Sequence, residues 1–196
     1  IDSNTSTTDE NFYSLYNGNY IKVGQSFTAN QYTKIYSAKF KLSKAGSPTG
    51  NAVAKLYAHS GTYGTNSVPG TLLATSDNFD VSTTTTGFNE VLFSGTERYV
   101  MTNGDYYVIA IEYSGGNSSN YIRVYDNTSS EHSGNLSRYL SSWTAMSGQD
   151  LQFYVYGETP VVGPANVKTY KGLASASVKT CKGLAIASVK TKKGLN

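Results

Sequence analysis

Short segments in which hydrophobic and polar residues alternate recur along most of the chain, from about residue 20 to 158. In the segment IYSAKFKLS every second side chain is hydrophobic, which gives a predicted buried set of Tyr36, Ala38, Phe40 and Leu42. A period of two is typical of a strand with one buried face. The segment DLQFYVYGE shows the same pattern, with Leu151, Phe153 and Val155 predicted inward and Gln152, Tyr154 and Tyr156 predicted outward.

Turn residues separate these segments, as in GSPTG, where a proline lies between two glycines. The most apolar segment, NGDYYVIAIEYSGG, is bounded by Asn-Gly and Gly-Gly, and we expect it to be a central strand covered on both faces. About eight to ten such segments with no helical periodicity predict an all-β fold, namely a two-sheet antiparallel sandwich of jelly-roll-like form.

The pattern changes near residue 158, and we expect three regions. A sandwich domain covers residues 1–158, with 1–20 as a polar N-terminal extension, and a linker framed by Pro160 and Pro164 covers 159–166. Residues 167–196 then repeat the phrase VKT-x-KGL three times with a period of eleven, followed by Ala in the first two units.

The repeat region is expected to form hairpins if it is ordered. A glycine in every unit and the β-branched Val and Thr disfavour a helix, and an odd period excludes one unbroken strand with a constant buried face. Each Lys-Gly pair is therefore expected to be a turn or a bulge, and the alternative is a solvated, disordered basic tail. The side chains expected to mediate assembly are Val167, Lys168, Lys171, Leu173, Val178, Lys179, Lys182, Leu184, Val189, Lys190 and Leu195.

Charge is divided unevenly between these regions. Residues 1–160 hold nine Lys and Arg against thirteen Asp and Glu, a net −4, whereas residues 161–196 hold seven Lys and no acid. The repeat region is therefore expected to dock on the acidic body of another copy by strand addition, and contacts that do not close would make a filament. A nucleic-acid partner is not expected, because Tyr170 is the only aromatic residue among these lysines.

Composition points to an exported protein. The chain of 196 residues is rich in Gly and Tyr, with 15% charged residues, and it begins at Ile1 with a polar stretch, as expected of a mature chain whose export signal has been removed. No hydrophobic run is long enough to span a membrane. The single cysteine, Cys181, excludes an intramolecular disulfide framework.

Four segments carry a resemblance: QSFTA, LSKAGSPTGNAVAKLYA, PGTLLATSD and GDYYVIAIEYSGG. They resemble the choice-of-anchor type of exported β-sandwich domain found in bacterial, archaeal and phage surface proteins, over about residues 20–157. The repeat region is similar to the VKT-x-N-G-L-A repeats that close many surface and virion proteins, with Lys at 171, 182 and 193 in place of Asn. The resemblance implies cell-surface or virion architecture and no catalytic residues.

No catalytic or cofactor motif stands out. His59 and His132 lack metal-ligand spacing and a nearby nucleophile motif, and each is expected to be solvated. The body carboxylates sit beside turn residues, where Asp is expected for backbone reasons. Asp126, Asn127 and Glu131 are the weak candidates for a structural calcium site, and no other metal or cofactor is expected.

Aromatic residues at outward positions suggest a sugar-binding platform as an alternative function. Flat exposed rings suit both sugar faces and protein interfaces. The candidates for carbohydrate contact are Tyr121, Tyr125, Tyr139 and Trp143, and further rings expected outward are Tyr57, Tyr113, Tyr154 and Tyr156.

The sequence thus predicts a non-enzymatic extracellular structural subunit that assembles with copies of itself into a filament or surface layer through its repeat region. The alternatives are a carbohydrate-binding or adhesion module anchored by that region, with polysaccharide or cell-wall polymer as partner, and a phage fibre or capsid-decorating protein.

Overall fold

A computed structural model describes residues 1–95, 98–128 and 131–160, together with the backbone of four two-residue strands farther along the chain. In its described residues the body consists mainly of β-strands, and a short 3-10 helix, η1, covers Val81–Thr83. The strands of the body are β1 (Asp2–Asn4), β2 (Glu10–Leu15), β3 (Lys22–Thr28), β4 (Thr33–Ala45), β5 (Asn51–Ser60), β6 (Val68–Thr75), β7 (Phe79–Asp80), β8 (Gly87–Leu92), β9 (Val100–Met101), β10 (Tyr106–Glu112), β11 (Tyr121–Asn127), β12 (Leu136–Tyr139), β13 (Trp143–Met146), β14 (Asp150–Leu151) and β15 (Phe153–Glu158).

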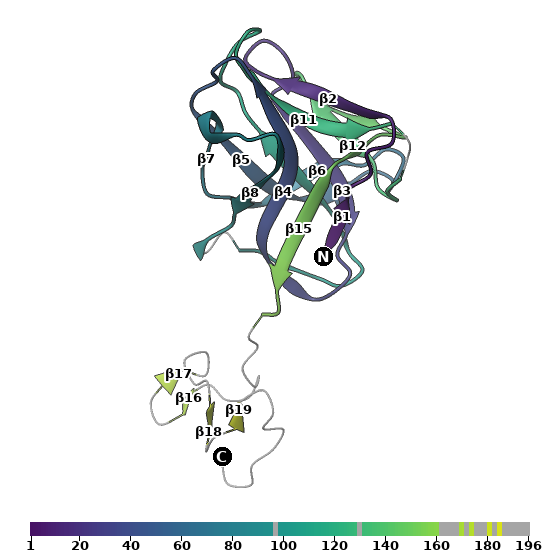
Figure 1. Ribbon diagram of the computed structural model, residues 1–196. Coiled ribbons are helices and arrows are strands. Elements are labelled where there is room, and N and C mark those ends of the chain that lie inside the picture. Colours follow the sequence, from purple (N-terminus) through teal and green to yellow (C-terminus); the bar gives the residue numbers. More distant parts are fainter. Residues whose placement is uncertain are drawn as a thin grey trace. The chain divides into compact units, whose positions relative to one another are not determined.

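These strands form two antiparallel sheets that pack face to face, which confirms the predicted two-sheet sandwich (Figure 1). Sheet A has eight strands in the order β1-β15-β4-β11-β14, with β2 beside β11 and with β8 and β9 beside β4. Sheet B has seven strands in the order β13-β12-β3-β10-β5-β6, with β7 beside β5. The long strand β4 is the axis of sheet A, because four other strands pair with it.

The core lies between the two sheets and is built from the inward set of each strand. Phe40 and Leu42 of β4 and Leu151, Phe153 and Val155 of the last two strands are at most 1% exposed, as the alternating pattern predicts. Sheet B contributes Phe27, Ile109 and Ile111 to the same cluster. Phe27 and Phe153 bring the two sheets together, with ring centroids 6.5 Å apart.

One residue of the alternating segment IYSAKFKLS faces outward although it was predicted to be buried. Tyr36 was predicted to be buried with Phe40, but its side chain is 46% exposed. A β-bulge explains the difference, since Tyr156 of β15 faces Ser37 and the next residue, Gly157, faces Ile35. Tyr36 is the extra residue of the bulge and turns outward.

The central strand β10 is covered on both faces, as predicted. Ile109 and Ile111 point into the core, while Val108 and Ala110 lie under Tyr57 and Trp143 on the other face of sheet B. Sheet B supplies this cover itself by curling, because its two edge strands β6 and β13 approach within 8 Å between Cα atoms. The prediction that Tyr57 and Tyr113 face outward is wrong, since they are only 8% and 2% exposed. Tyr57 is covered by the curled sheet, whereas Tyr113 belongs to the core between the two sheets.

Several segments differ from the sequence-based expectation. Residues 1–20, expected to be an extension, contribute β1 and β2 to sheet A. The strands β12 and β13 were not predicted, because each has only four residues and lies among Ser and Gly.

The residues after Glu158 form a separate unit, Thr159–Asn196, and the two units are described independently. Within it β16 (Thr169–Tyr170) pairs with β17 (Leu173–Ala174), and β18 (Thr180–Cys181) pairs with β19 (Leu184–Ala185), both antiparallel. No helix in the described part of the chain is long and apolar enough to cross a membrane.

If the bulge turns Tyr36 outward, substitutions of Phe40 and Tyr36 should differ in their effect on stability. Phe40→Ala should lower the free energy of unfolding by about 3–5 kcal/mol, because it leaves a cavity in the core. Tyr36→Ala should cost less than about 1 kcal/mol, because the side chain is largely in water and loses mainly its contact with Arg98. Urea unfolding of both variants measures this. Similar losses would show that Tyr36 belongs to the core and that the bulge is wrong.

Candidate functional site

The structure divides the four sugar-contact candidates between the two outer faces of the sandwich. Tyr121 and Tyr125 belong to β11 of sheet A and alternate with the core residues Ile122 and Val124, so they lie on the outer face of that sheet. Tyr139 and Trp143 belong to the paired strands β12 and β13 of sheet B. The four rings therefore do not form one platform.

Trp143 is part of a packed cluster on sheet B. Its ring contacts Tyr57 at 6.3 Å and Tyr139 at 5.4 Å between centroids and packs against Val108 and Ala110. Beside it the Glu112 carboxylate accepts hydrogen bonds from the Tyr57 hydroxyl and the Lys55 ammonium group. Burial, together with the hydrogen bond to Glu112 and its negative charge, raises the pKa of the Tyr57 hydroxyl. These contacts indicate that Trp143 stabilises the curled sheet.

The outer face of sheet A carries a more open set of rings, which we call the aromatic face. Its members come from four strands, and all but Tyr121 contact another member edge to face or by stacking. They are Phe12, Phe88, Tyr121, Tyr125, Tyr154 and Tyr156. Phe12, Phe88 and Tyr156 are 37–42% exposed, and an exposed cluster of large apolar side chains is typical of an interaction surface.

Basic side chains lie over these rings. Lys39 lies over Tyr156 at 5.1 Å from the ring centroid, and Lys41 lies over Tyr125 at 5.3 Å. Arg123 lies over both Phe12 and Tyr121. The aromatic face therefore presents hydrophobic rings and positive charge together, which is a combination that binds planar or ring-shaped ligands.

The three calcium candidates do not come together. Adjacent residues of a strand point to opposite faces, so Asp126 points into the core while Asn127 points away from it and donates to the Ser6 carbonyl at 3.3 Å. Glu131 is exposed in a loop. Across residues 1–95, 98–128 and 131–160, no three His, Cys, Asp or Glu side chains group as metal ligands.

Asp126 is instead a buried carboxyl on the core side of β11. Its side chain is 1% exposed, and neither carboxylate oxygen has a hydrogen-bond partner among the described residues. Burial raises the pKa of the Asp126 carboxyl to about 7. Alternation with Ile122 and Val124 places Asp126 on the inward face of β11, but a carboxyl group before a stretch rich in Asn and Ser was expected to be solvated.

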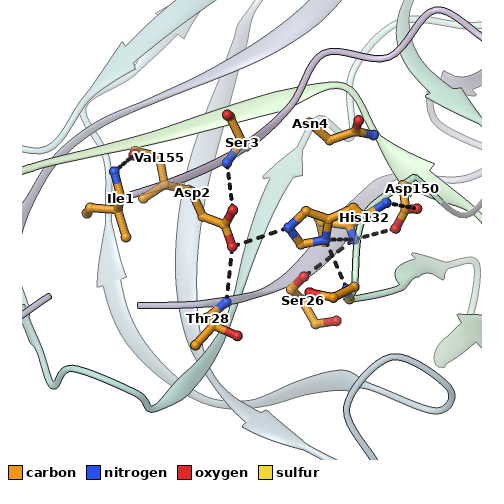
Figure 2. A network of polar contacts seen from close by, with 12 residues as sticks. Ile1, Asp2, Ser3, Asn4, Ser26, Thr28, His132, Asp150 and Val155 are labelled. Atoms are coloured by element: carbon orange, nitrogen blue, oxygen red, sulfur yellow. Dashed lines mark hydrogen bonds and ion pairs between the residues drawn. The ribbon is translucent and has the colours of Figure 1, made fainter. Parts of the chain in front are cut away.

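His132 was expected to be solvated, and that expectation is wrong. Its side chain is 7% exposed and lies at the centre of a polar network below β1 (Figure 2). Its Nε2 atom is 3.2 Å from the Asp2 carboxylate, and its Nδ1 atom accepts from the Gly134 N–H at 3.0 Å. The proton of the neutral ring therefore sits on Nε2.

The rest of the network joins both sheets. The Asp150 carboxylate accepts from the backbone N–H of His132 at 3.0 Å and from the Gln25 side chain at 2.8 Å. Asp2 also accepts from the N–H groups of Ser3 and Thr28. Burial alone would raise the pKa of Asp2, but His132 and these two N–H groups outweigh it and lower the pKa. With both ring nitrogens of His132 engaged, the arrangement suits structural support better than proton transfer to a substrate.

His59 lies elsewhere, on the edge of a shallow depression of about 330 Å³ that is also lined by Tyr99 and Tyr106. Its Nε2 atom is 2.9 Å from the Ser67 hydroxyl. Burial lowers the pKa of His59, which favours the neutral ring.

Most of the predicted assembly residues lie outside the described residues. Only the backbone positions of Leu173 and Leu184 are described, each facing a residue of the preceding strand. The other members of that set are Val167, Lys168, Lys171, Val178, Lys179, Lys182, Val189, Lys190 and Leu195. Their role stays a prediction.

Comparison of the chain with protein-family models, with curated proteins and with solved structures gave no match in any of the three.

The unpartnered carboxyl of Asp126 predicts an unusual pH dependence. An unfolded Asp loses its proton near pH 3.8, whereas folded Asp126 keeps it to about pH 7. Between these values the unfolded state binds fewer protons, so stability should fall as pH rises from about 4 to 7. Asp126→Asn should remove this contribution, and its stability relative to wild type should increase over that range by on the order of 2–4 kcal/mol. Urea unfolding from pH 4 to 8 measures it, with the exposed Asp105→Asn as control. A constant difference across the range would contradict the assignment.

Asp2 predicts the opposite trend. Its pKa is lowered in the folded state, so its contribution to stability is complete above the unfolded value of 3.8 and is lost as pH falls through the folded value. Asp2→Asn should therefore cost about 1–3 kcal/mol at neutral pH and less in acid, because the network loses a charged acceptor. The matched control is Asp9→Asn, since Asp9 is exposed and Asn also tolerates its positive φ of 49°. Equal stability of the two variants at pH 7 would show that the network contributes nothing.

Proposed function

We propose that this protein is a non-enzymatic, extracellular structural subunit that joins copies of itself through its repeat region. The observation that carries the proposal is a backbone pairing that recurs after eleven residues. Thr169 faces Ala174 in the first hairpin, and Thr180 faces Ala185 in the second. The sequence period therefore corresponds to a structural unit.

The size of each hairpin supports an external partner. Two strands of two residues each bury little surface, and an isolated hairpin is at best marginally stable in water. The repeat region carries seven lysines and no acid, while residues 1–160 carry a net −4. The body of a neighbouring copy therefore offers a surface of complementary charge.

Two further considerations support the non-enzymatic, exported character of the subunit. The imidazole nitrogens of His132 are engaged within the structure, and the Asp150 carboxylate beside it is held by the Gln25 side chain and a backbone N–H. The resemblance to choice-of-anchor sandwiches, and of the repeats to those that close surface and virion proteins, favours a place on a cell surface or a virion.

A second candidate function is carbohydrate binding or adhesion, with the repeat region as an anchor. The observation that favours it is the aromatic face, where exposed rings and basic groups alternate on one side of the sandwich. The surface that supports this candidate therefore includes Tyr121 and Tyr125 and leaves out Tyr139 and Trp143, whose rings pack on sheet B.

Removal of residues 159–196 tests the structural proposal. The full chain should form fibres or large oligomers, whereas Ile1–Glu158, a compact unit by itself, should be a folded monomer. Light scattering gives the mass, and electron microscopy of the same samples shows the shape. A chain that lacks only residues 189–196, the third repeat, is the intermediate truncation between the full chain and Ile1–Glu158. Fibres that persist without the repeat region, or a full chain that stays monomeric at all concentrations, would contradict the proposal.

A further inference from the structure

Arg123 differs from the other basic side chains of the aromatic face in having no acidic partner. Lys39 is 3.6 Å from Glu90, and Lys41 forms an ion pair with Glu10. Arg98, at the end of the same sheet, pairs with Glu158. Arg123 makes no ion pair with any residue of the described part of the chain, so no acidic side chain described there compensates its positive charge.

The guanidinium group of Arg123 is nevertheless held in place. It lies 4.9 Å from the centroid of the Phe12 ring and 5.4 Å from that of Tyr121. One terminal nitrogen donates to the Tyr121 hydroxyl at 3.3 Å. The Nε atom is buried and has no hydrogen-bond partner among the described residues. Rings on two neighbouring strands thus fix the orientation of the cation before any ligand arrives, which reduces the entropy lost on binding.

A serine lies beside Arg123 on each of the two neighbouring strands. Ser14 of β2 and Ser43 of β4 are the residues directly opposite Arg123 on the two neighbouring strands. The Ser43 hydroxyl is 3.1 Å from the Tyr125 hydroxyl. The Tyr16 ring extends the surface, with its centroid 5.7 Å from that of Tyr121. A fixed cation is therefore flanked by serine and tyrosine hydroxyls and bordered by flat rings.

We infer that this surface binds an acidic saccharide, with the sugar carboxylate or sulfate on Arg123 and the sugar ring against Tyr121, Tyr125 or Phe12. The guanidinium fork matches the two oxygens of such a group. Aromatic faces suit the C–H side of a sugar ring, and the flanking hydroxyl groups suit its hydroxyls. The site lies on a sheet face bordered by β2 and β4, which suits an extended polymer better than a small isolated anion. This inference rests on the second candidate function and specifies its ligand.

Binding of defined polysaccharides to the full chain tests the inference. The probes are oligogalacturonate for carboxylate, dextran sulfate for sulfate, dextran as the neutral polymer, and free sulfate. Titration calorimetry at low and at physiological salt should show binding of at least one acidic polymer, with affinity at least tenfold above that for dextran and for free sulfate. A preference between the first two probes identifies the anionic group.

Arg123→Gln is compared with the double variant Glu10→Gln/Lys41→Gln, because each removes one positive charge that lies over a ring of the same face. Arg123→Gln should reduce affinity for the acidic polymer by about tenfold or more, whereas the double variant should change it by less than about threefold, since it removes both members of an ion pair and leaves the net charge of the face unchanged. Arg123→Lys keeps the charge without the fork and should fall between them. Circular dichroism and melting temperatures confirm that each variant folds.

The outcomes separate the inference from the function on which it rests. The role of Arg123 would be overturned if wild type and Arg123→Gln bound the acidic polymer equally well, or if dextran bound as tightly as the acidic polymers. Carbohydrate binding itself would still hold in either case. A wild-type chain that binds none of the four probes would overturn the acidic-saccharide site, and binding to other neutral glycans would then decide whether the second candidate function survives. Neither result bears on assembly through the repeat region.

Discussion

The sandwich depends on the junction between β14 and β15, where the chain changes its pairing partner. β14 pairs with β11, and after Gln152 the chain continues as β15, which pairs with β4 and β1. Buried backbone groups at such a junction cost free energy unless they are hydrogen-bonded. Both backbone groups of Leu151 are hydrogen-bonded to side chains. Its N–H donates to Gln25 of sheet B, and its carbonyl accepts from Asn4. The junction therefore links both sheets and the first strand of the chain.

The residues of β14 and β15 also contribute to both faces of sheet A. Their inward residues, Leu151, Phe153 and Val155, fill the core, and their outward residues Tyr154 and Tyr156 belong to the aromatic face. Because the register with β4 places Lys39 opposite Tyr154, the basic groups lie among the rings. A surface that combines rings and cations is thus a consequence of strand pairing, and it is rigid because the core fixes the strands beneath it.

Alternation and turn residues were sufficient to predict the two-sheet sandwich, the inward set of β15 and the covering of β10 on both faces. They were insufficient where a long-range contact overrides the local pattern. A bulge opposite Gly157 turns Tyr36 outward, and the curl of sheet B buries Tyr57 and partly buries Trp143. The sugar-contact candidates were split for a related reason, since a sequence does not reveal which sheet a short strand joins. His132 stands in a polar stretch, so its burial left no local signal, whereas Asp126 continues the inward alternation of Ile122 and Val124 and was missed because it is charged.

Hydrogen exchange at the Leu151 amide tests most directly whether the partner change at the junction between β14 and β15 holds the sandwich together. That N–H is bonded at 2.8 Å to the side chain of Gln25, which lies on the opposite sheet. If the junction is central, Leu151 should exchange only through global unfolding, with the same opening free energy as Ile109 in the middle of β10. Exchange of Leu151 within seconds to minutes while Ile109 stays protected would show that the junction opens by itself, and the account would be contradicted.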